Sequence, residues 1–241
     1  MKISFIGHGN MAKAMIKGIV KSGIVAEEDI KASDSDSENQ SAADFADFIF
    51  LTIKPQMYSH VISNLTNIAD KVFITVAPGI KTDFLPNAKI IRTMPNTPAL
   101  VGEGVTAICR NNRVTDEEFA FVKKLLASFS AVYEFEESQM NHVVALSGSS
   151  PAYAYMFIEA IADYSAQNGI PHDIAIKMAA QTLLGSAKMV LESTESPATL
   201  RERVCSKGGT TIEAVQKLQE KNFAEIIAEA MAACTKRAME F

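Results

Sequence analysis

The chain has 241 residues, of which 48% are hydrophobic and 21% are charged, and this composition excludes disordered and collagen-like proteins. A net charge of −5 gives no electrostatic reason to expect nucleic acid or an anionic membrane as a partner. Three scattered cysteines and four histidines without metal-site spacing predict reduced thiols, no metal and a cytoplasmic location. No segment approaches 18 uninterrupted apolar residues, so we expect none to span a membrane.

The first half of the chain alternates short apolar runs with segments of helical periodicity. The runs predict strands at residues 2–6, 29–33, 48–53, 72–76, 89–92, 105–108 and 131–135, with helices at 10–21, 55–68 and 115–129. This alternation predicts an α/β domain with a doubly wound, mainly parallel sheet over residues 1–136. Only about a dozen residues separate Asp34 from Phe48, so we expect the second βαβ unit to lack a full crossover helix.

The second half has a helical period only. It predicts an all-α domain over residues 137–241, with helices at 151–168, 171–191, 197–204, 210–221 and 223–239. Alanine, methionine and leucine cover more than one face of these helices. This pattern favours burial in a subunit interface, and a thick monomeric core is the alternative.

A glycine-rich turn follows the first predicted strand and precedes the first helix. It matches the pattern G-x-G-x-x-A through Gly7, His8, Gly9, Asn10, Met11 and Ala12. The first glycine permits a tight turn, the second admits a pyrophosphate and the alanine allows close packing, while the helix N-terminus offers free N–H groups. We therefore predict a dinucleotide site in which His8 is incidental; a plain strand-to-helix turn is the alternative.

Asp34 stands at the end of the second predicted strand. A carboxylate at this position binds a ribose 2′-hydroxyl in dinucleotide-binding folds and would repel a 2′-phosphate. The stretch "ASDSDSENQ", residues 32–40, contains no arginine or lysine. These residues favour NADH, although Asp34 in a mobile polar loop is the alternative.

Three further loops end buried strands at the edge where open α/β sheets bind ligands. Lys54 follows one strand, residues 77–79 follow the next, and "MPNTPA", residues 94–99, follows a third. Two prolines hold the last loop rigid around Asn96. We predict that these loops line the ligand cleft. The alternatives are that Lys54 is a solvated lysine at a strand end and that "MPNTPA" is an ordinary turn.

A second glycine-rich stretch, "SKGGTT", opens a helix at residues 206–211. Gly208 and Gly209 free the backbone to present N–H groups, and Thr210 and Thr211 add hydroxyls. A carboxylate is the natural ligand of this arrangement. The alternative is that Thr210 is an ordinary helix N-cap.

Together, "GHGNMA", "TIKP", "RTMPNTPALV", "SGSSPAYAYMFIEA" and "VCSKGGTTIEAV", in this order and spacing, resemble the pyrroline-5-carboxylate reductase family over essentially the whole chain. The resemblance implies an N-terminal Rossmann domain and a C-terminal helical domain that forms a homodimer. In this family such dimers often assemble further into a ring. It also implies reduction of L-1-pyrroline-5-carboxylate to L-proline, the last step of proline biosynthesis, by NADPH or NADH.

The resemblance also implies roles for individual residues. Residues 7–12 would hold the pyrophosphate and Ser33 with Asn39 the adenosine ribose, while Lys54, Pro55, Ala77 and Pro78 would flank the nicotinamide. Thr210 and Thr211, with Gly208 and Gly209, would bind the substrate carboxylate and ring nitrogen, with Glu137 and Asn96 nearby and Thr211 as candidate proton donor. The chain departs from the family pattern at Lys207, which would help attract a carboxylate, and at Ser150, which would narrow the pocket.

Two other functions remain open at this stage. A β-hydroxyacid dehydrogenase also joins a Rossmann domain to helices, but it needs a helical lysine as general acid beside a glycine-rich substrate motif. Lysines stand on a predicted helix between Lys177 and Lys188, whereas the glycines lie in "SKGGTT". A nucleotide-sensing oligomer without catalysis is the other possibility, and any substantial turnover would exclude it.

Overall fold

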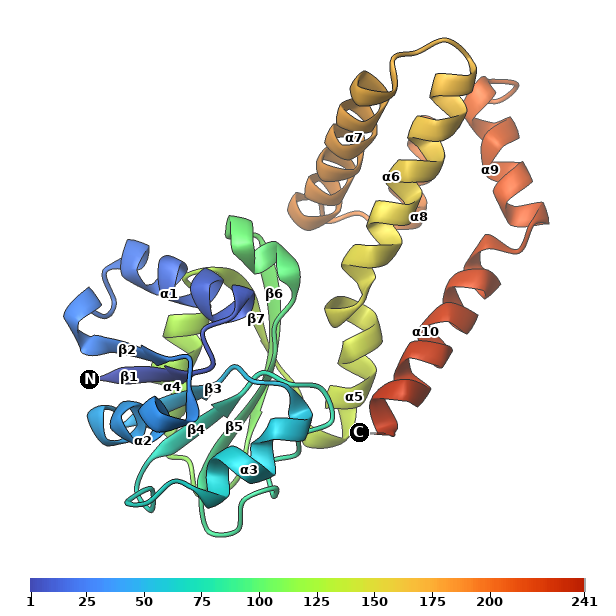
Figure 1. Ribbon diagram of the computed structural model, residues 1–241. Coiled ribbons are helices and arrows are strands. Elements are labelled where there is room, and N and C mark those ends of the chain that lie inside the picture. The colour runs from blue at the N-terminus through green and yellow to red at the C-terminus, as the bar shows by residue number, and fades with distance from the viewer. Residues whose placement is uncertain (241) are drawn as a thin grey trace. The chain divides into compact units, whose positions relative to one another are not determined.

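The computed structural model describes residues 1–240, which form two compact units (Figure 1). One unit consists of residues 1–151 together with the chain from Ala232 onward. The other consists of Ala152–Met231. The predicted domain boundary between residues 136 and 137 remains a prediction.

The first unit is built on a seven-stranded sheet with the order β2-β1-β3-β4-β5-β6-β7. The strands are β1 Ile3–Ile6, β2 Ile30–Ser33, β3 Phe48–Leu51, β4 Val72–Thr75, β5 Lys89–Met94, β6 Gly104–Arg110 and β7 Ser130–Glu134. The first five run parallel, whereas β6 pairs antiparallel with β5 and parallel with β7. The predicted mainly parallel, doubly wound sheet is confirmed.

Short helices connect these strands. They are α1 Asn10–Ser22, η1 Glu27–Asp29, α2 Asp36–Phe45, η2 Pro55–Met57, α3 Tyr58–Ser63, η3 Thr97–Val101 and α4 Asp116–Leu126. After the last strand come η4 Glu137–Gln139, α5 Met140–Val143 and the π-helical turn η5 Val144–Gly148. The helix expected at residues 55–68 is shorter than predicted because α3 ends at Ser63.

The expectation that no full crossover helix fits between Asp34 and Phe48 is wrong. Helix α2 occupies Asp36–Phe45. Its ten residues rise about 15 Å, and a strand of four residues spans about 13 Å, so a short helix suffices to return the chain along short strands. Ala42 and Ala43 are fully buried, and their small side chains permit close packing of α2 on the sheet.

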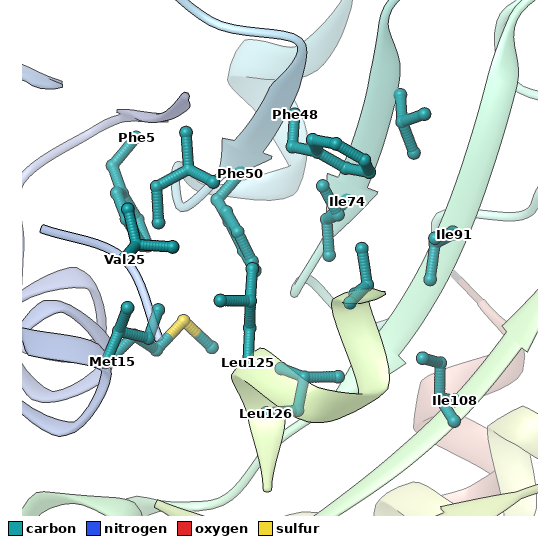
Figure 2. Packing of buried hydrophobic residues seen from close by; sticks show 14 of the residues in the cluster. Phe5, Met15, Val25, Phe48, Phe50, Ile74, Ile91, Ile108, Leu125 and Leu126 are labelled. Atoms are coloured by element: carbon teal, nitrogen blue, oxygen red, sulfur yellow. The ribbon is translucent and has the colours of Figure 1, made fainter. Parts of the chain in front are cut away.

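Alternation along the strands gives the sheet two apolar faces. Phe5, Phe50 and Ile74 pack on one face with residues of α1 and α4, among them Met15 and Leu125 (Figure 2). The rings of Phe5 and Phe50 stack with centroids 4.7 Å apart. Residues of the opposite parity, including Leu51 and Phe73, pack on the other face with Tyr58 and Val61 of α3.

The second unit is helical, as predicted. Its helices are α6 Ser150–Gln167, α7 His172–Glu192, α8 Pro197–Val204, α9 Thr210–Glu220 and α10 Phe223–Met239, of which the first and last extend beyond the unit. Within residues 152–231 the buried side chains are those of Ala162, Ala175 and Ala179. Large apolar side chains such as Tyr164 and Leu191 are exposed by 70% and 78%.

Helix α7 is the one helix within residues 1–240 that is long and apolar enough, by length and composition, to cross a membrane. Only 11% of its apolar window is buried within this chain. A single helix of this kind is weak evidence for a membrane protein, because an apolar helix that packs against another subunit has the same composition.

Candidate active site

The turn after β1 needs glycine at two positions for different reasons. Gly7 has a φ of +95°, and a Cβ there would lie 2.7 Å from the Thr52 carbonyl oxygen and from Ile53 Cγ2. Gly9 is the N-cap of α1, no side chain caps that helix end, and a Cβ at Gly9 would meet nothing within 4 Å. Gly7 therefore serves the fold, while Gly9 keeps open space in front of the free N–H groups of α1.

Thr52 holds this turn from the neighbouring strand. Its hydroxyl donates to the Gly7 carbonyl at 2.5 Å, and its backbone N–H donates to the Ile6 carbonyl at 2.9 Å. On the other side, the Gly7 N–H donates to the Ser33 carbonyl at 3.0 Å. Both flanking strands thus fix the turn, and no sequence pattern singles out Thr52 beyond its place in "TIKP".

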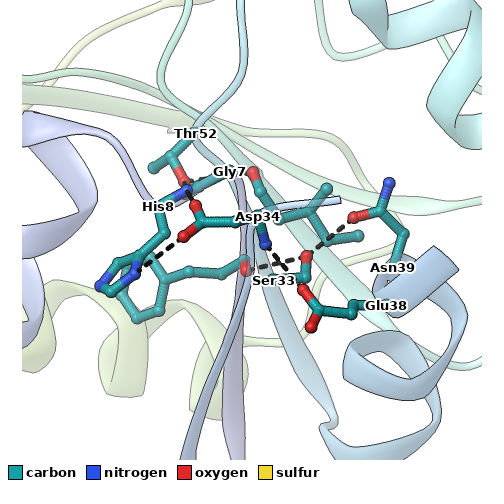
Figure 3. Close-up of polar contacts among 9 residues, drawn as sticks. Gly7, His8, Ser33, Asp34, Glu38, Asn39 and Thr52 are labelled. Atoms are coloured by element: carbon teal, nitrogen blue, oxygen red, sulfur yellow. Dashed lines mark hydrogen bonds and ion pairs between the residues drawn. The ribbon is translucent and has the colours of Figure 1, made fainter. Parts of the chain in front are cut away.

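Asp34 lies against the glycine-rich turn (Figure 3). Its carboxylate accepts a hydrogen bond of 3.1 Å from the His8 backbone N–H, and the His8 ring nitrogen Nδ1 lies 3.6 Å from the other carboxylate oxygen. Glu38 accepts a bond of 3.2 Å from the Asp34 N–H. Two carboxylates therefore stand at the end of β2, and His8, expected to be incidental, contacts one of them.

Ser33 and Asn39, predicted to flank the ribose, lie together in the structure. The Ser33 hydroxyl donates to Asn39 Oδ1 at 2.7 Å, and both residues are buried (Figure 3). Asn39 Nδ2 donates to the Asp36 carboxylate at 3.3 Å, and His60 contacts the same carboxylate at 3.1 Å. These side chains hydrogen-bond to one another and fix the start of α2 against the end of β2, next to Asp34.

The loops after β3 and β4 are placed at the same sheet edge, because both strands run parallel to β1. Lys54 is exposed and precedes the 3-10 helix that Pro55 begins. Ala77 is buried and Pro78 half-buried directly after β4. The structure thus gathers the residues predicted for the nicotinamide side at one edge, although their contacts with a cofactor remain a prediction.

Asn96 is buried after β5, and its side chain forms hydrogen bonds within the protein. Its Nδ2 donates to the Ser147 carbonyl at 3.1 Å, and its Oδ1 accepts from the Val105 N–H at 2.8 Å. The side chain therefore ties the "MPNTPA" loop to the π-helical turn η5. The predicted contact of Asn96 with substrate remains a prediction.

Glu137 is held by groups that the sequence analysis did not consider. Its Oε1 accepts from Arg92 Nη1 at 2.8 Å, and its Oε2 accepts from the backbone N–H and the hydroxyl of Thr82. The Arg92 side chain is only 2% exposed. An arginine that ends the apolar run "KIIR" was the available signal, since arginine is rarely buried without a partner.

Cys109 pairs with Arg92 across β5 and β6 and is buried. The pKa of its thiol is raised to about 12, mainly by burial and secondarily by the Glu137 charge, while Arg92 opposes the shift. This thiol is therefore protonated at neutral pH and is no nucleophile. Among residues 1–240 there is no cluster of three or more histidine, cysteine, aspartate or glutamate residues that could hold a metal ion.

The second glycine-rich turn, in the helical unit, also combines a glycine at positive φ with a glycine N-cap, but a Cβ at its N-cap Gly209 would lie within 3 Å of Ser206 Oγ. Gly208 has a φ of +70°, and Gly209 is the N-cap of α9 without a side-chain cap. Thr210 is the first residue of the helix, so the alternative that it is the N-cap is wrong. Thr210 is exposed and Thr211 half-buried at an open helix N-terminus, which is suited to an anion.

Comparison with known proteins identifies the family. Residues 137–241 match the model for pyrroline-5-carboxylate reductase dimerisation, and residues 2–79 match that for NADP oxidoreductase, coenzyme F420-dependent. Pyrroline-5-carboxylate reductase of Escherichia coli (strain K12) is 41% identical over 98% of this chain and 96% of its own length. The chain belongs to the pyrroline-5-carboxylate reductase family. The reductase of Glycine max is 32% identical over 99% of this chain and 95% of its own.

Solved structures of the family have the same fold. Plasmodium falciparum pyrroline carboxylate reductase with NADP bound superposes with a TM-score of 0.92 at 28% identity, covering 100% of this chain and 97% of that one. The enzyme of Streptococcus pyogenes gives 0.88 at 31% identity, covering 100% and 99%. This chain is accordingly an NAD(P)H-dependent oxidoreductase, with a Rossmann domain and a helical dimerisation domain that makes it a homo-oligomer.

Proposed function

We propose that this protein reduces L-1-pyrroline-5-carboxylate to L-proline, the last step of proline biosynthesis, with NADH or NADPH. The observation that carries the proposal is the full-length similarity to reductases of bacteria and plants. The geometry agrees, because two open helix N-termini suit the two anionic groups that the reaction must hold, a pyrophosphate and a carboxylate.

The cofactor site is proposed on the first unit. The open space at Gly9 and the uncapped N-terminus of α1 fit a pyrophosphate. Asp34 would bind a ribose hydroxyl beside the buried pair Ser33 and Asn39, and Lys54, Pro55, Ala77 and Pro78 would flank the nicotinamide. When bound, the cofactor supplies the hydride; the protein orients it and excludes water.

The substrate site is proposed at the start of α9. The N–H groups after Gly208 and Gly209 would hold the carboxylate, and Thr210 and Thr211 would hydrogen-bond the carboxylate and the ring nitrogen. A hydride adds to the imine carbon while the nitrogen keeps or gains one proton and becomes an amine. A threonine hydroxyl is a weak acid, so Thr211 orients an already protonated iminium or relays its proton.

The exposed apolar side chains of Ala152–Met231 support a homodimer formed through the helical unit, either alone or within a ring of dimers. In this assembly the apolar surface of α7 lies against the partner subunit and not in a membrane. We further propose a cytoplasmic enzyme whose cofactor domain ends near residue 136.

The proposed reaction is tested by initial rates of NADH and NADPH oxidation with pyrroline-5-carboxylate and with a panel of 3-hydroxy acids. We expect turnover with pyrroline-5-carboxylate and none with the 3-hydroxy acids. Thr211→Ala should lower kcat/KM about 10²-fold, the scale of one orienting or proton-relay contact. Thr211→Ser keeps the hydroxyl and is the matched control. Near-normal kinetics of Thr211→Ala would remove Thr211 from the mechanism.

The same rates test the cofactor preference. Because Asp34 and Glu38 stand at the end of β2, NADH should serve at least as well as NADPH, and Asp34→Asn should improve the use of NADPH. A wild-type preference for NADPH above about tenfold, or 1.4 kcal/mol, would show that Asp34 does not face the 2′ position.

A further inference from the structure

Arg92 places a charged side chain in the middle of an apolar sheet face. On one side of it along β5, Ile90 packs with the cluster under α3. On the other side, Met94 packs with Met140 and Val143 of α5. Arg92 therefore lies where two separate coverings of the sheet meet, and its side chain is 2% exposed.

The guanidinium joins these two coverings. Nη2 donates to Asn141 Oδ1 at 2.6 Å, which ties it to α5, and Nη1 donates to Glu137 Oε1 at 2.8 Å. Glu137 in turn accepts the backbone N–H of Thr82 at 3.1 Å and the Thr82 hydroxyl. A charge pair with additional hydrogen bonds stabilises a buried arginine, and of the Arg92 guanidinium nitrogens Nη1 and Nη2 have such partners while the buried Nε has none within residues 1–240.

Thr82 is fixed from both sides. While Glu137 holds its N–H and hydroxyl, Asn111 Nδ2 donates to its carbonyl at 3.2 Å and to the Ala88 carbonyl at 2.9 Å. Only Pro78 to Lys81 separate Thr82 from Ala77, the first predicted nicotinamide contact after β4. Thr82 therefore lies five residues along the chain from Ala77, in the loop that begins at the ligand edge of the sheet.

We propose that Arg92 is a positioning residue for the cofactor: through Glu137 it fixes Thr82 and thereby the Ala77–Pro78 segment that flanks the nicotinamide. The role rests on the proposed function, since it presumes a nicotinamide at this edge. It assigns Glu137 to the support of the cofactor loop, in place of the substrate contact that the family resemblance implied. Loss of the anchor should weaken cofactor binding and misplace the hydride donor, to which rates are sensitive.

The test compares Arg92→Met and Thr82→Val with Glu118→Gln. The control breaks the ion pair of Lys89 Nζ with Glu118 Oε1, 2.6 Å, at the other end of the same strand. We expect Arg92→Met to raise the KM and the Kd for NADH about tenfold, and Thr82→Val to raise them in the same direction. Glu118→Gln should leave both constants unchanged even where it lowers the Tm.

The Thr82→Val variant and a Kd measured without substrate separate a positioning role of Arg92 from a merely structural one. If Arg92→Met does not fold, Thr82→Val decides, because it removes only the hydroxyl of a loop residue. The Kd for NADH is measured by fluorescence titration without substrate, so a failure of the reductase assay does not affect it. Wild-type Kd and KM in Thr82→Val, together with a lowered Tm and unchanged Kd in any folded Arg92→Met, would make the cluster merely structural and overturn the proposal.

Discussion

The two units of the chain bury very different side chains. The sheet unit encloses phenylalanines, isoleucines and leucines that are wholly inaccessible, such as Phe5, Phe50 and Leu125. Within Ala152–Met231 the buried side chains are three alanines, while tyrosines, methionines and leucines are exposed. Burial of a large apolar side chain contributes about 1.5–3 kcal/mol. We therefore expect the sheet unit to carry its own stability and the helical unit to depend on a surface supplied by another subunit.

A charge on the exposed apolar surface of the helical unit should have the largest effect. Leu184 on α7 is 47% exposed, and Leu184→Glu would place an unpaired carboxylate in the proposed subunit interface, at a cost of several kcal/mol. We expect the oligomer to dissociate, as measured by sedimentation velocity. Lys17→Glu on the exposed face of α1 is the control. An unchanged mass in Leu184→Glu would place α7 outside the interface.

Removal of a ring from the sheet core should come next. Phe50 is fully buried and stacks on Phe5, so Phe50→Ala should lower the free energy of unfolding by about 3–5 kcal/mol. Tyr133→Ala on the edge strand β7, where the side chain is 50% exposed, should cost less than about 1 kcal/mol. Denaturant unfolding measures both, and equal losses would contradict the difference in burial.

The two glycines of the first turn should separate fold from function. Gly7→Ala forces a Cβ against the Thr52 carbonyl at a positive φ and should cost about 1–3 kcal/mol of stability. Gly9→Ala meets no protein atom, so stability should stay within about 0.5 kcal/mol. Its added methyl should instead obstruct the pyrophosphate and weaken NADH binding. Unfolding and NADH titrations of both variants test this division, and tight NADH binding by Gly9→Ala would refute it.

The smallest effect concerns acidification of the sheet unit. Burial alone would raise the pKa of Glu118, but hydrogen bonds from Lys89 and Thr115 outweigh it and hold the pKa below its usual value. A carboxyl with a lowered pKa stabilises the folded state above its unfolded pKa, about 4.3, and this stability is lost as the pH falls through the folded value. Between pH 6 and pH 3 the free energy of unfolding should fall less in Glu118→Gln than in the wild type, by about 1 kcal/mol or less. Identical slopes would exclude the contribution.

Much of the fold could be predicted because its signals are local. The buried run "FIFL", the glycines of the first turn and the prolines that open α8 and η2 each specify their own element. Helix α2 was not predicted because it depends on a relation between elements: its length suffices only because the neighbouring strands are four residues long. The antiparallel entry of β6 is likewise a property of the assembled sheet.

The site divides in the same way. The residues proposed to bind through their backbone, Gly7 to Ala12 and Gly208 to Thr211, could be predicted because glycine spacing reflects backbone geometry. Thr52, Thr82 and Arg92 were missed because each acts on a segment distant in sequence, across two strands or between a strand and a helix. A sequence pattern shows the residue types of such contacts but not their partners.

The reversed direction of β6 and β7 decides where the chain leaves the sheet. Because β7 runs opposite to β1, it ends at the edge remote from the cofactor turn, and residues 137–148 must travel back. As a helical run they rise about 18 Å, close to the 20 Å of the six-residue strand β5. The bond from Asn96 to Ser147 marks their arrival beside the end of β5. Had β7 run parallel to β1, the same helix would have carried "SGSSPAY" to the wrong end of the sheet.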